Sequence, residues 1–249
     1  MATDIRLLQV LRSLNEIGTC TVVELHRATG ISRQSIYRAI EALSQHEYVE
    51  RIPGDSRVRL TSKVRLLSSG YRDDYCMAET AGKVLVELQK RVQWPSSLAI
   101  PDKDKIVVRE TNRYKSPFVF DHGKVGLRLP LLGSALGLSY LAFCNRRTQL
   151  TTLTLLRASE DKWDLIARNH KETDRLLRIT VARGYSVRQG GIEAGTNSIA
   201  VPVMVENEAL ASIGVTYAKR ALTVRQAVSQ FLPDLLSAAK QIATSAPRH

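Results

Sequence analysis

The chain has 249 residues, which is long enough for one large domain or two of ordinary size. Its 44% hydrophobic and 24% charged residues are typical of a globular protein and exclude a disordered one. The net charge of +12 indicates an anionic partner. Residues 1–74, however, hold 11 Lys and Arg against 9 Asp and Glu, so the placement of individual charges matters more than their sum.

Nothing in the sequence predicts a membrane span, an export signal or a metal site. The longest apolar run, LPLLGSALGLSYLAF (129–143), contains Gly and Ser and is too short to cross a bilayer. The N-terminal MATDIRLLQVL begins directly with an amphipathic pattern, unlike a signal peptide. Cys20, Cys76 and Cys144 are scattered, without CxxC spacing or histidine partners, so we expect unpaired thiols. The sequence thus predicts a cytoplasmic protein with no cofactor, no metal ion and no membrane contact.

The first predicted elements are three helices. Apolar residues recur at helical spacing over Asp4–Glu16, and a second helix is predicted over Val22–Thr29 with Thr21 as its N-cap. A third helix, Arg33–His46, follows a three-residue turn and has Ser32 as its N-cap. Two helices joined by a short, glycine-containing turn are typical of a helix-turn-helix.

A β-hairpin is predicted directly after these helices, with strands YVERI (48–52) and RVRLT (57–61) around the turn PGDS (53–56). The third helix has a polar face opposite its apolar stripe, and a recognition helix reads base edges in the major groove from such a face. Serine hydroxyls and the free N–H groups of the first turn suit phosphate oxygens. The residues predicted to contact double-stranded DNA are Ser32, Arg33, Gln34, Ser35, Tyr37, Arg38, Arg51, Arg57 and Arg59.

The rest of the chain predicts a sheet with helices on its faces, α+β in class. A connector, 62–76, leads to a second domain that begins with a helix over Met77–Val92. The strands are predicted at Ser97–Ile100, Lys105–Thr111, Gly126–Pro130, near Ser186, at Ser198–Val205 and at Ala209–Tyr217. The later helices are predicted to start at Ser134 and to cover Arg147–Leu156, Lys162–Arg183 and Val224–Thr244.

Long segments of both parts resemble one known family. TVVELHRATGISRQSIYRAIEALSQHEYVER (21–51) is similar to the winged helix-turn-helix of the IclR family of bacterial transcription regulators, and RLTSKVRLLSSGYRD (59–73) to its linker. KVGLRLPLLGSALGLSYLAF (124–143) and RGYSVRQGGIEAGTNSIAVPVMVENEALASIGVTYA (183–218) resemble its effector domain. The runs VVRET, LPLL, LAFC and SIAVP are similar to MhpR-type regulators of hydroxyphenylpropionate breakdown. The resemblance implies a winged helix-turn-helix at 1–61, a helical linker at 62–76 and a GAF-like effector domain at 77–249.

The resemblance also implies a site for a small carboxylic acid between the sheet and the helix that starts near Ser134. Members that sense aromatic acids have an arginine at the position of Arg188, and a guanidinium binds a carboxylate through two hydrogen bonds. Trp94 and Met204 are candidates for an apolar wall, and Arg109 and Arg128 are weaker candidates for the carboxylate. The family positions of the pocket match Ser134, Ala135, Leu136, Arg188, Ser198, Gly214 and Thr216.

Family members act as homodimers or dimers of dimers on pseudo-palindromic operators. The resemblance therefore implies that this chain assembles in the same way and controls a catabolic operon. One position departs from the family pattern: Glu47 follows the third helix where relatives have glycine. We expect a cost of about 1 kcal/mol there or a shifted helix end.

Other interpretations stay open at this point. Arg188 in a surface salt bridge, and Ser198 and Thr216 as ordinary strand residues, are alternatives to a ligand site. The effector is alternatively a small keto acid, or the winged helix docks a protein beside an enzyme-like or assembly second domain, although polar outward residues favour DNA. No GxSxG, HExxH, P-loop or GxGxxG motif is present, so we do not expect an enzyme.

Overall fold

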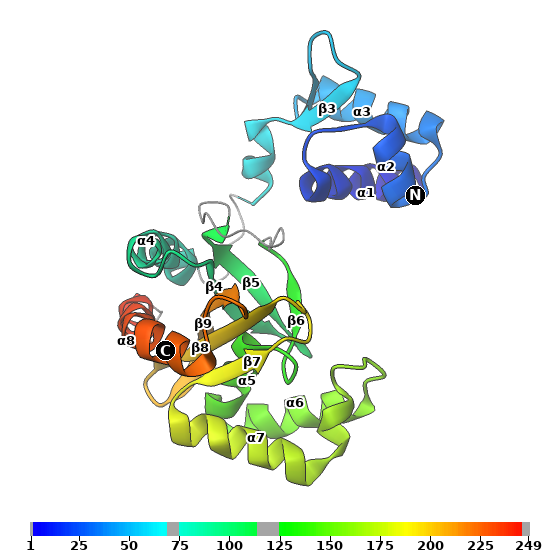
Figure 1. Cartoon of the computed structure of the whole chain (residues 1–249). Helices are drawn as coiled ribbons and strands as arrows, with labels where there is room; N and C mark the ends of the chain where they lie inside the picture. Colours follow the sequence, from blue (N-terminus) through cyan, green and yellow to red (C-terminus); the bar gives the residue numbers. More distant parts are fainter. Residues whose placement is uncertain (1, 69–74, 114–124, 246–249) are drawn as a thin grey trace. The chain divides into compact units, whose positions relative to one another are not determined.

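The computed structural model describes residues 2–68, 75–113 and 125–245, in two compact units, Met1–Asp73 and Asp74–His249. The first unit contains α1 (Ala2–Ile17), α2 (Val22–Thr29) and α3 (Arg33–Gln45) (Figure 1). Its three-stranded antiparallel sheet has the order β1-β3-β2, formed by β1 (Cys20–Thr21), β2 (Val49–Arg51) and β3 (Arg57–Leu60). The sequence did not predict β1, because two residues are too few to show a strand periodicity.

The caps predicted for the second and third helices are confirmed. The Thr21 N–H donates to Glu24 Oε2 at 2.7 Å and the Glu24 N–H donates to Thr21 Oγ1 at 3.3 Å, a reciprocal capping box. These hydrogen bonds hold the pKa of Glu24 below its ordinary value. Gly30 ends α2 with a φ of 70° and its N–H donates to the His26 carbonyl oxygen at 2.9 Å. The turn between α2 and α3 therefore has the tight geometry of a helix-turn-helix.

Glu47 has the left-handed backbone that a glycine adopts easily, with a φ of 59°. Its N–H donates to the Ser44 carbonyl oxygen at 2.9 Å, and the Tyr48 N–H donates to the Leu43 carbonyl oxygen at 2.8 Å. These two bonds form a Schellman motif, so the end of α3 is not shifted. Glu47 Oε2 also accepts from Lys63 Nζ at 2.8 Å. The cost of this residue is therefore backbone strain and not a displaced hairpin.

We expect Glu47→Gly to make the N-terminal unit more stable. Glycine removes a left-handed strain of about 1 kcal/mol, and the exposed ion pair with Lys63 contributes little in return. The unfolding midpoint of this unit should rise by roughly 4 °C in a calorimetric scan. Glu47→Gln, which loses the ion pair but keeps the strain, is the matched control. Equal midpoints for the two variants would show that the left-handed backbone carries no strain.

After the hairpin, Ser62–Ser68 form a 3-10 helix, η1, in the predicted linker. The next part of that prediction, 69–74, lies outside the described residues.

The second unit contains one six-stranded antiparallel sheet of order β6-β5-β4-β9-β8-β7. Helices α4 and α8 cover one face of the sheet. Helix α5 packs against the other face, and α6 and α7 lie beyond α5 on that side and share its hydrophobic cluster (Figure 1). The strands are β4 (Ser96–Asp102), β5 (Lys105–Thr111), β6 (Arg128–Pro130), β7 (Ser186–Gln189), β8 (Thr196–Val205) and β9 (Glu208–Ala218). The helices are α4 (Tyr75–Val92), α5 (Ala135–Phe143), α6 (Arg146–Ala158), α7 (His170–Arg183) and α8 (Val224–Ala243). The α+β class predicted from the element order is confirmed.

Strand β9 shows how the sheet separates a core from a cavity. Ile213, Val215 and Tyr217 are fully buried in the apolar cluster with α4 and α8. Successive side chains of a strand point to opposite faces, so Gly214 and Thr216 point to the side of α5. The sheet therefore has one continuous hydrophobic face, and on the other face it leaves room for polar groups.

One element of the second unit was predicted wrongly. The expected helix over Lys162–Arg183 is two elements, the 3-10 helix η3 (Leu165–Arg168) and α7. Lys105 Nζ donates to the fully buried Asp164 at 3.0 Å, which ties the segment before η3 to strand β5. Asn169 then starts α7 by accepting from the Glu172 N–H at 3.1 Å. Asn followed three residues later by Glu was a visible helix-start signal within the predicted run.

Candidate functional site

The outward face of α3 is polar and its inward face is apolar. Ile36, Ile40 and Leu43 are buried in the core of the N-terminal unit, which fixes the orientation of the helix. Ser32, Arg33, Gln34, Tyr37 and Arg38 are exposed, and Ser35 is half-buried. Tyr37 is 49% exposed, although an aromatic ring gains by burial. The structure thus places the predicted helix residues together on one surface.

The two serines hold the first turn of α3 in place. The Ser35 N–H donates to Ser32 Oγ at 3.3 Å, and Ser32 Oγ lies 3.0 Å from Ser35 Oγ. The first N–H groups of a helix have no partner within the helix, and they carry the positive end of its dipole. This turn therefore offers donors and a favourable potential to a phosphate.

The three arginines of the hairpin differ in their surroundings. Arg59 Nε lies 2.6 Å from Glu50 Oε1, and Arg57 Nε lies 3.6 Å from Asp55 Oδ2. Both pairs are exposed and contribute little to stability, so both guanidinium groups can exchange partners. Arg51 lines an open hollow together with Tyr37 and Glu41 of α3. Within the described part of the chain, Arg33, Arg38 and Arg51 form no ion pair.

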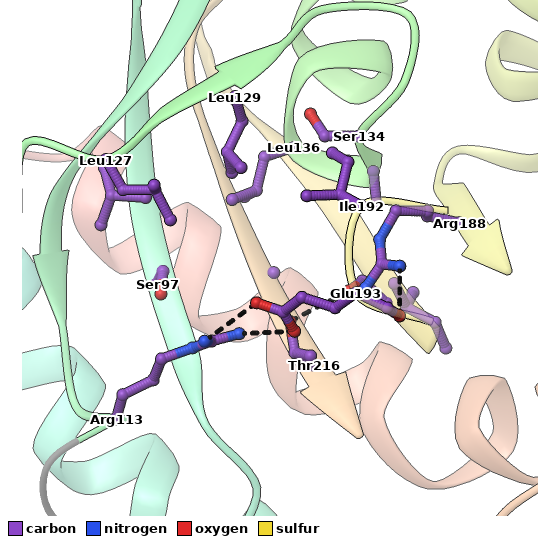
Figure 2. A pocket seen from close by; sticks show the side chains of 15 residues that line it. Ser97, Arg113, Leu127, Leu129, Ser134, Leu136, Arg188, Ile192, Glu193 and Thr216 are labelled. Atoms are coloured by element: carbon purple, nitrogen blue, oxygen red, sulfur yellow. Dashed lines mark hydrogen bonds and ion pairs between the residues drawn. The ribbon is translucent and has the colours of Figure 1, made fainter. Parts of the chain in front are cut away.

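A cavity in the second unit brings together distant parts of the chain. All seven predicted pocket residues line it, although they come from α5, β7, β8 and β9 (Figure 2). The volume is about 50 Å³. The complete lining is Ser97, Val108, Arg113, Leu127, Leu129, Ser134, Ala135, Leu136, Arg188, Ile192, Glu193, Ser198, Ile199, Gly214 and Thr216.

Two small residues let α5 lie against the sheet at this cavity. A Cβ atom on Gly214 would lie 2.8 Å from the Ile199 carbonyl oxygen and 3.2 Å from Leu136 Cδ2. Ser134 is the N-cap of α5: its Oγ accepts from the Gly137 N–H at 3.0 Å and donates to the Pro130 carbonyl oxygen at 2.7 Å. Both hydrogen bonds of the Ser134 hydroxyl therefore hold the start of α5, and the missing side chain of Gly214 leaves room for Leu136 of that helix.

Arg188 is half-buried and its guanidinium is surrounded by uncharged acceptors. Nη2 donates to Thr196 Oγ1 at 2.9 Å and to Ser198 Oγ at 2.8 Å, and Nη1 donates to the Gly190 carbonyl oxygen. Burial lowers the pKa of Arg188 below its ordinary value, and nearby Glu193 and Arg113 act on it in opposite directions. An arginine keeps its charge under such a shift, so the cavity wall contains a cation that has no direct carboxylate partner among the described residues.

A second arginine in the cavity wall does have a carboxylate partner. Arg113 Nη1 and Nη2 donate to Glu193 Oε1 and Oε2 at 3.1 and 3.3 Å (Figure 2). Glu193 Oε2 also accepts from Thr196 Oγ1 at 3.1 Å, and Ser198 Oγ lies 3.0 Å from Thr216 Oγ1. A continuous polar network therefore follows one side of the cavity, opposite the leucine side chains.

The sequence did not single out Arg113 or Glu193. The two lie 80 positions apart, and neither belongs to a local motif that predicts a contact. The glycine-rich run GGIEAG (190–195) around Glu193 was the one available signal. Trp94, Met204, Arg109 and Arg128 do not line the cavity, and Arg128 is paired with Asp102 instead. These four residues have the expected chemical character and lie on or near strands of the sheet. Residue type and strand position alone therefore did not predict which side chains face the cavity.

The described ranges offer neither a membrane span nor a metal site. They contain no helix that is long and apolar enough to cross a membrane. They also contain no group of three or more His, Cys, Asp or Glu side chains able to hold a metal ion. Burial raises the pKa of the Cys144 thiol to about 11, which makes it a poor nucleophile.

The two units match two family models. Residues 5–53 match the IclR helix-turn-helix domain, and residues 71–244 match the C-terminal domain described as "Bacterial transcriptional regulator IclR C-terminal". The fold and the two matches define a DNA-binding transcription regulator with a small-molecule effector, and not an enzyme. The chain belongs to the IclR family of bacterial transcriptional regulators.

Relatives of this family cover nearly the whole chain. The probable transcriptional regulator SauR of Cupriavidus necator is 25% identical over 241 residues, 95% of this chain and 92% of SauR. The crystal structure of Thermotoga maritima IclR has a TM-score of 0.75 at 20% identity and covers 98% of both chains. An IclR homologue from Microbacterium hydrocarbonoxydans, solved in complex with 4-hydroxybenzoate, has a TM-score of 0.70 at 21% identity and covers 98% of both chains. These structures share the fold of this chain.

Proposed function

We propose that this regulator binds an aromatic carboxylic acid in the cavity and, as a homodimer or a dimer of dimers, a pseudo-palindromic operator of a catabolic operon. The observation that carries this proposal is the convergence of seven residues from four separate elements on one cavity whose wall contains Arg113 and Arg188. The runs similar to MhpR-type regulators support the aromatic class. In this proposal, residues 1–61 bind DNA, 62–76 connect, and 77–249 sense the effector.

The chemistry of the cavity suits an amphipathic anion. Two guanidinium groups and one carboxylate line it, so the charged lining residues carry an excess positive charge. The opposite side is apolar, formed by Leu127, Leu129 and Leu136 (Figure 2). An aromatic ring against the leucines and a carboxylate toward the arginines would satisfy both sides. The structural neighbour from Microbacterium hydrocarbonoxydans, which binds 4-hydroxybenzoate, supports this class of ligand.

The DNA half of the proposal rests on the outward face of α3 and on the hairpin. Arg33 and Gln34 have the donors that read guanine and adenine edges, and the first turn of α3 suits a phosphate. Paired copies related by a two-fold axis would meet two half-sites of a pseudo-palindrome. An effector that prefers one arrangement of the dimer would then change the affinity for DNA, and DNA would change the affinity for the effector by the same factor.

The test is a thermal-shift and calorimetric titration with 4-hydroxybenzoate. A ligand that binds only the folded state raises the unfolding midpoint, and we expect this for the carboxylate but not for neutral 4-hydroxybenzamide. A duplex recovered by selection from a random pool should then bind with an affinity that changes when 4-hydroxybenzoate is present. If the protein responded to pyruvate but not to 4-hydroxybenzoate, the assignment as a regulator would stand and the effector would be a keto acid in place of an aromatic acid. No response to any carboxylate would refute the effector class.

A further inference from the structure

We propose that Glu193 holds the place of the effector's carboxylate on Arg113 in the free protein, and that the ligand binds by displacing this side chain. The inference deepens the proposed function and rests on it, because it concerns how the same cavity accepts an acid. It assigns the recognition of the carboxylate to Arg113 and gives Arg188 a positioning role.

The geometry of the pair is that of a bound carboxylate ligand. Arg113 meets Glu193 through two nearly parallel hydrogen bonds of 3.1 and 3.3 Å, the arrangement that a guanidinium forms with a free carboxylate. The side chains of Arg113 and Glu193 are 12% and 21% exposed, so the pair is shielded from water and from salt. An external acid can take this position only if the Glu193 carboxylate leaves it.

Arg188 is much less able to exchange its partners. Its Nη atoms donate to carbonyl oxygens of Gly190 and Thr196 and to the hydroxyls of Thr196 and Ser198. The carbonyl groups are part of the backbone of loop 190–195 and its junction with β8, so they cannot leave without unfolding that loop. Arg188 therefore fixes the loop that carries Glu193. The exchangeable carboxylate in this network is the Glu193 side chain.

The size of the cavity also requires a side chain to move. Its volume is about 50 Å³, whereas an engineered cavity that binds benzene measures about 150 Å³. The Thr196 N–H donates to the Glu193 carbonyl oxygen at 3.0 Å, which holds the backbone while the side chain turns away. Gly191 and Gly195 flank this position, and no atom lies within 4 Å of a Cβ built on Gly195. Turning Glu193 outward opens space and releases the two Arg113 Nη donors that this carboxylate occupies.

The test compares affinities for 4-hydroxybenzoate in a double-mutant cycle on the full chain. Glu193→Gln keeps the shape of the side chain but removes the competing charge, so we expect the carboxylate to bind about tenfold more tightly than in the wild type. Arg113→Gln should weaken it about tenfold or more. In Arg113→Gln/Glu193→Gln the gain should disappear, because there is no guanidinium left for which the two carboxylates compete. Glu87→Gln, on the exposed surface of α4, is the control for the change in net charge.

Four outcomes would overturn the inference. Unchanged or weaker binding in Glu193→Gln, with wild-type binding intact, would refute displacement and leave the proposed effector class standing. A gain of the same size in the Arg113→Gln background would mean simple repulsion by Glu193 and not exchange. If no carboxylate binds to the wild type or to Glu193→Gln, the inference and the effector class both fall. Binding of 4-hydroxybenzamide that rises as much as that of the acid would also contradict a competition between carboxylates.

Discussion

Replacing Arg33 by alanine is expected to weaken sequence-specific binding to the selected operator strongly while leaving the fold and the effector affinity unchanged. A bidentate arginine contact with a guanine contributes about 1–3 kcal/mol, and a two-fold dimer loses two of them, roughly 2–6 kcal/mol. This corresponds to a loss of about 30-fold or more in affinity. Arg33 is exposed and forms no ion pair among the described residues, so no folded contact is lost with it.

The measurement is a fluorescence titration of the duplex at several salt concentrations. A phosphate contact changes the slope of log affinity against log salt by about 0.9, whereas a base contact changes the affinity at constant slope. We expect a nearly constant slope for Arg33→Ala. Arg12→Ala removes the same charge from exposed α1 and is the matched control. Wild-type affinity in Arg33→Ala would place the reading surface elsewhere, and loss of binding in Arg12→Ala would point to a general charge effect.

The second large effect is expected from Gly137→Ala, which should destabilise the effector-binding unit by roughly 3 kcal/mol, at the upper end of overpacking costs. A Cβ atom at this position would lie 2.5 Å from the Leu131 carbonyl oxygen and 2.8 Å from its carbonyl carbon. These are backbone atoms of a fully buried residue. No side chain can turn aside to relieve the overlap, so the whole helix α5 must shift. The shift also disturbs the Gly137 N–H bond to Ser134 Oγ at the cavity.

Gly82→Ala in α4 is the matched control for this variant. The nearest atom to a Cβ on Gly82 is Glu110 Cδ at 3.9 Å, an ordinary contact with a flexible side chain. The substitution should therefore stabilise the protein by about 1 kcal/mol through helix propensity. Thermal and urea unfolding of both variants give the comparison. If Gly137→Ala is as stable as Gly82→Ala, the close approach of α5 to Leu131 is not a constraint on the fold.

The helix-turn-helix was predictable because its signals are local. Thr21 and Ser32 cap the helices that follow them, and Gly30 stands where the chain needs a left-handed residue. Glu47 shows where a local rule yields to context. Two hydrogen bonds of the Schellman motif hold its backbone in the left-handed region, although a residue with a Cβ atom favours a negative φ.

Elements shaped by distant contacts were harder to predict. Strand β1 exists because Cys20 and Thr21 pair with Val58 and Arg57. The attachment of the segment before η3 to strand β5 depends on the bond between Lys105 and Asp164, which are 59 positions apart. Such contacts leave no periodicity within either segment, so a sequence pattern cannot indicate them.

The sequence by itself determined the two-part organisation, the polar face of α3 and the candidate positions for an effector, because each depends on residue type within a short stretch or on family resemblance. Only the tertiary structure decided which of these positions share one cavity, and that Arg113 and Glu193 join them there. It also decided that Arg188 is bound to its own loop, with its Nη donors already in use. The physical reason is that a cavity is formed by antiparallel strands and a helix from distant parts of the chain. Their register and close approach are set by packing, and no single segment contains that information.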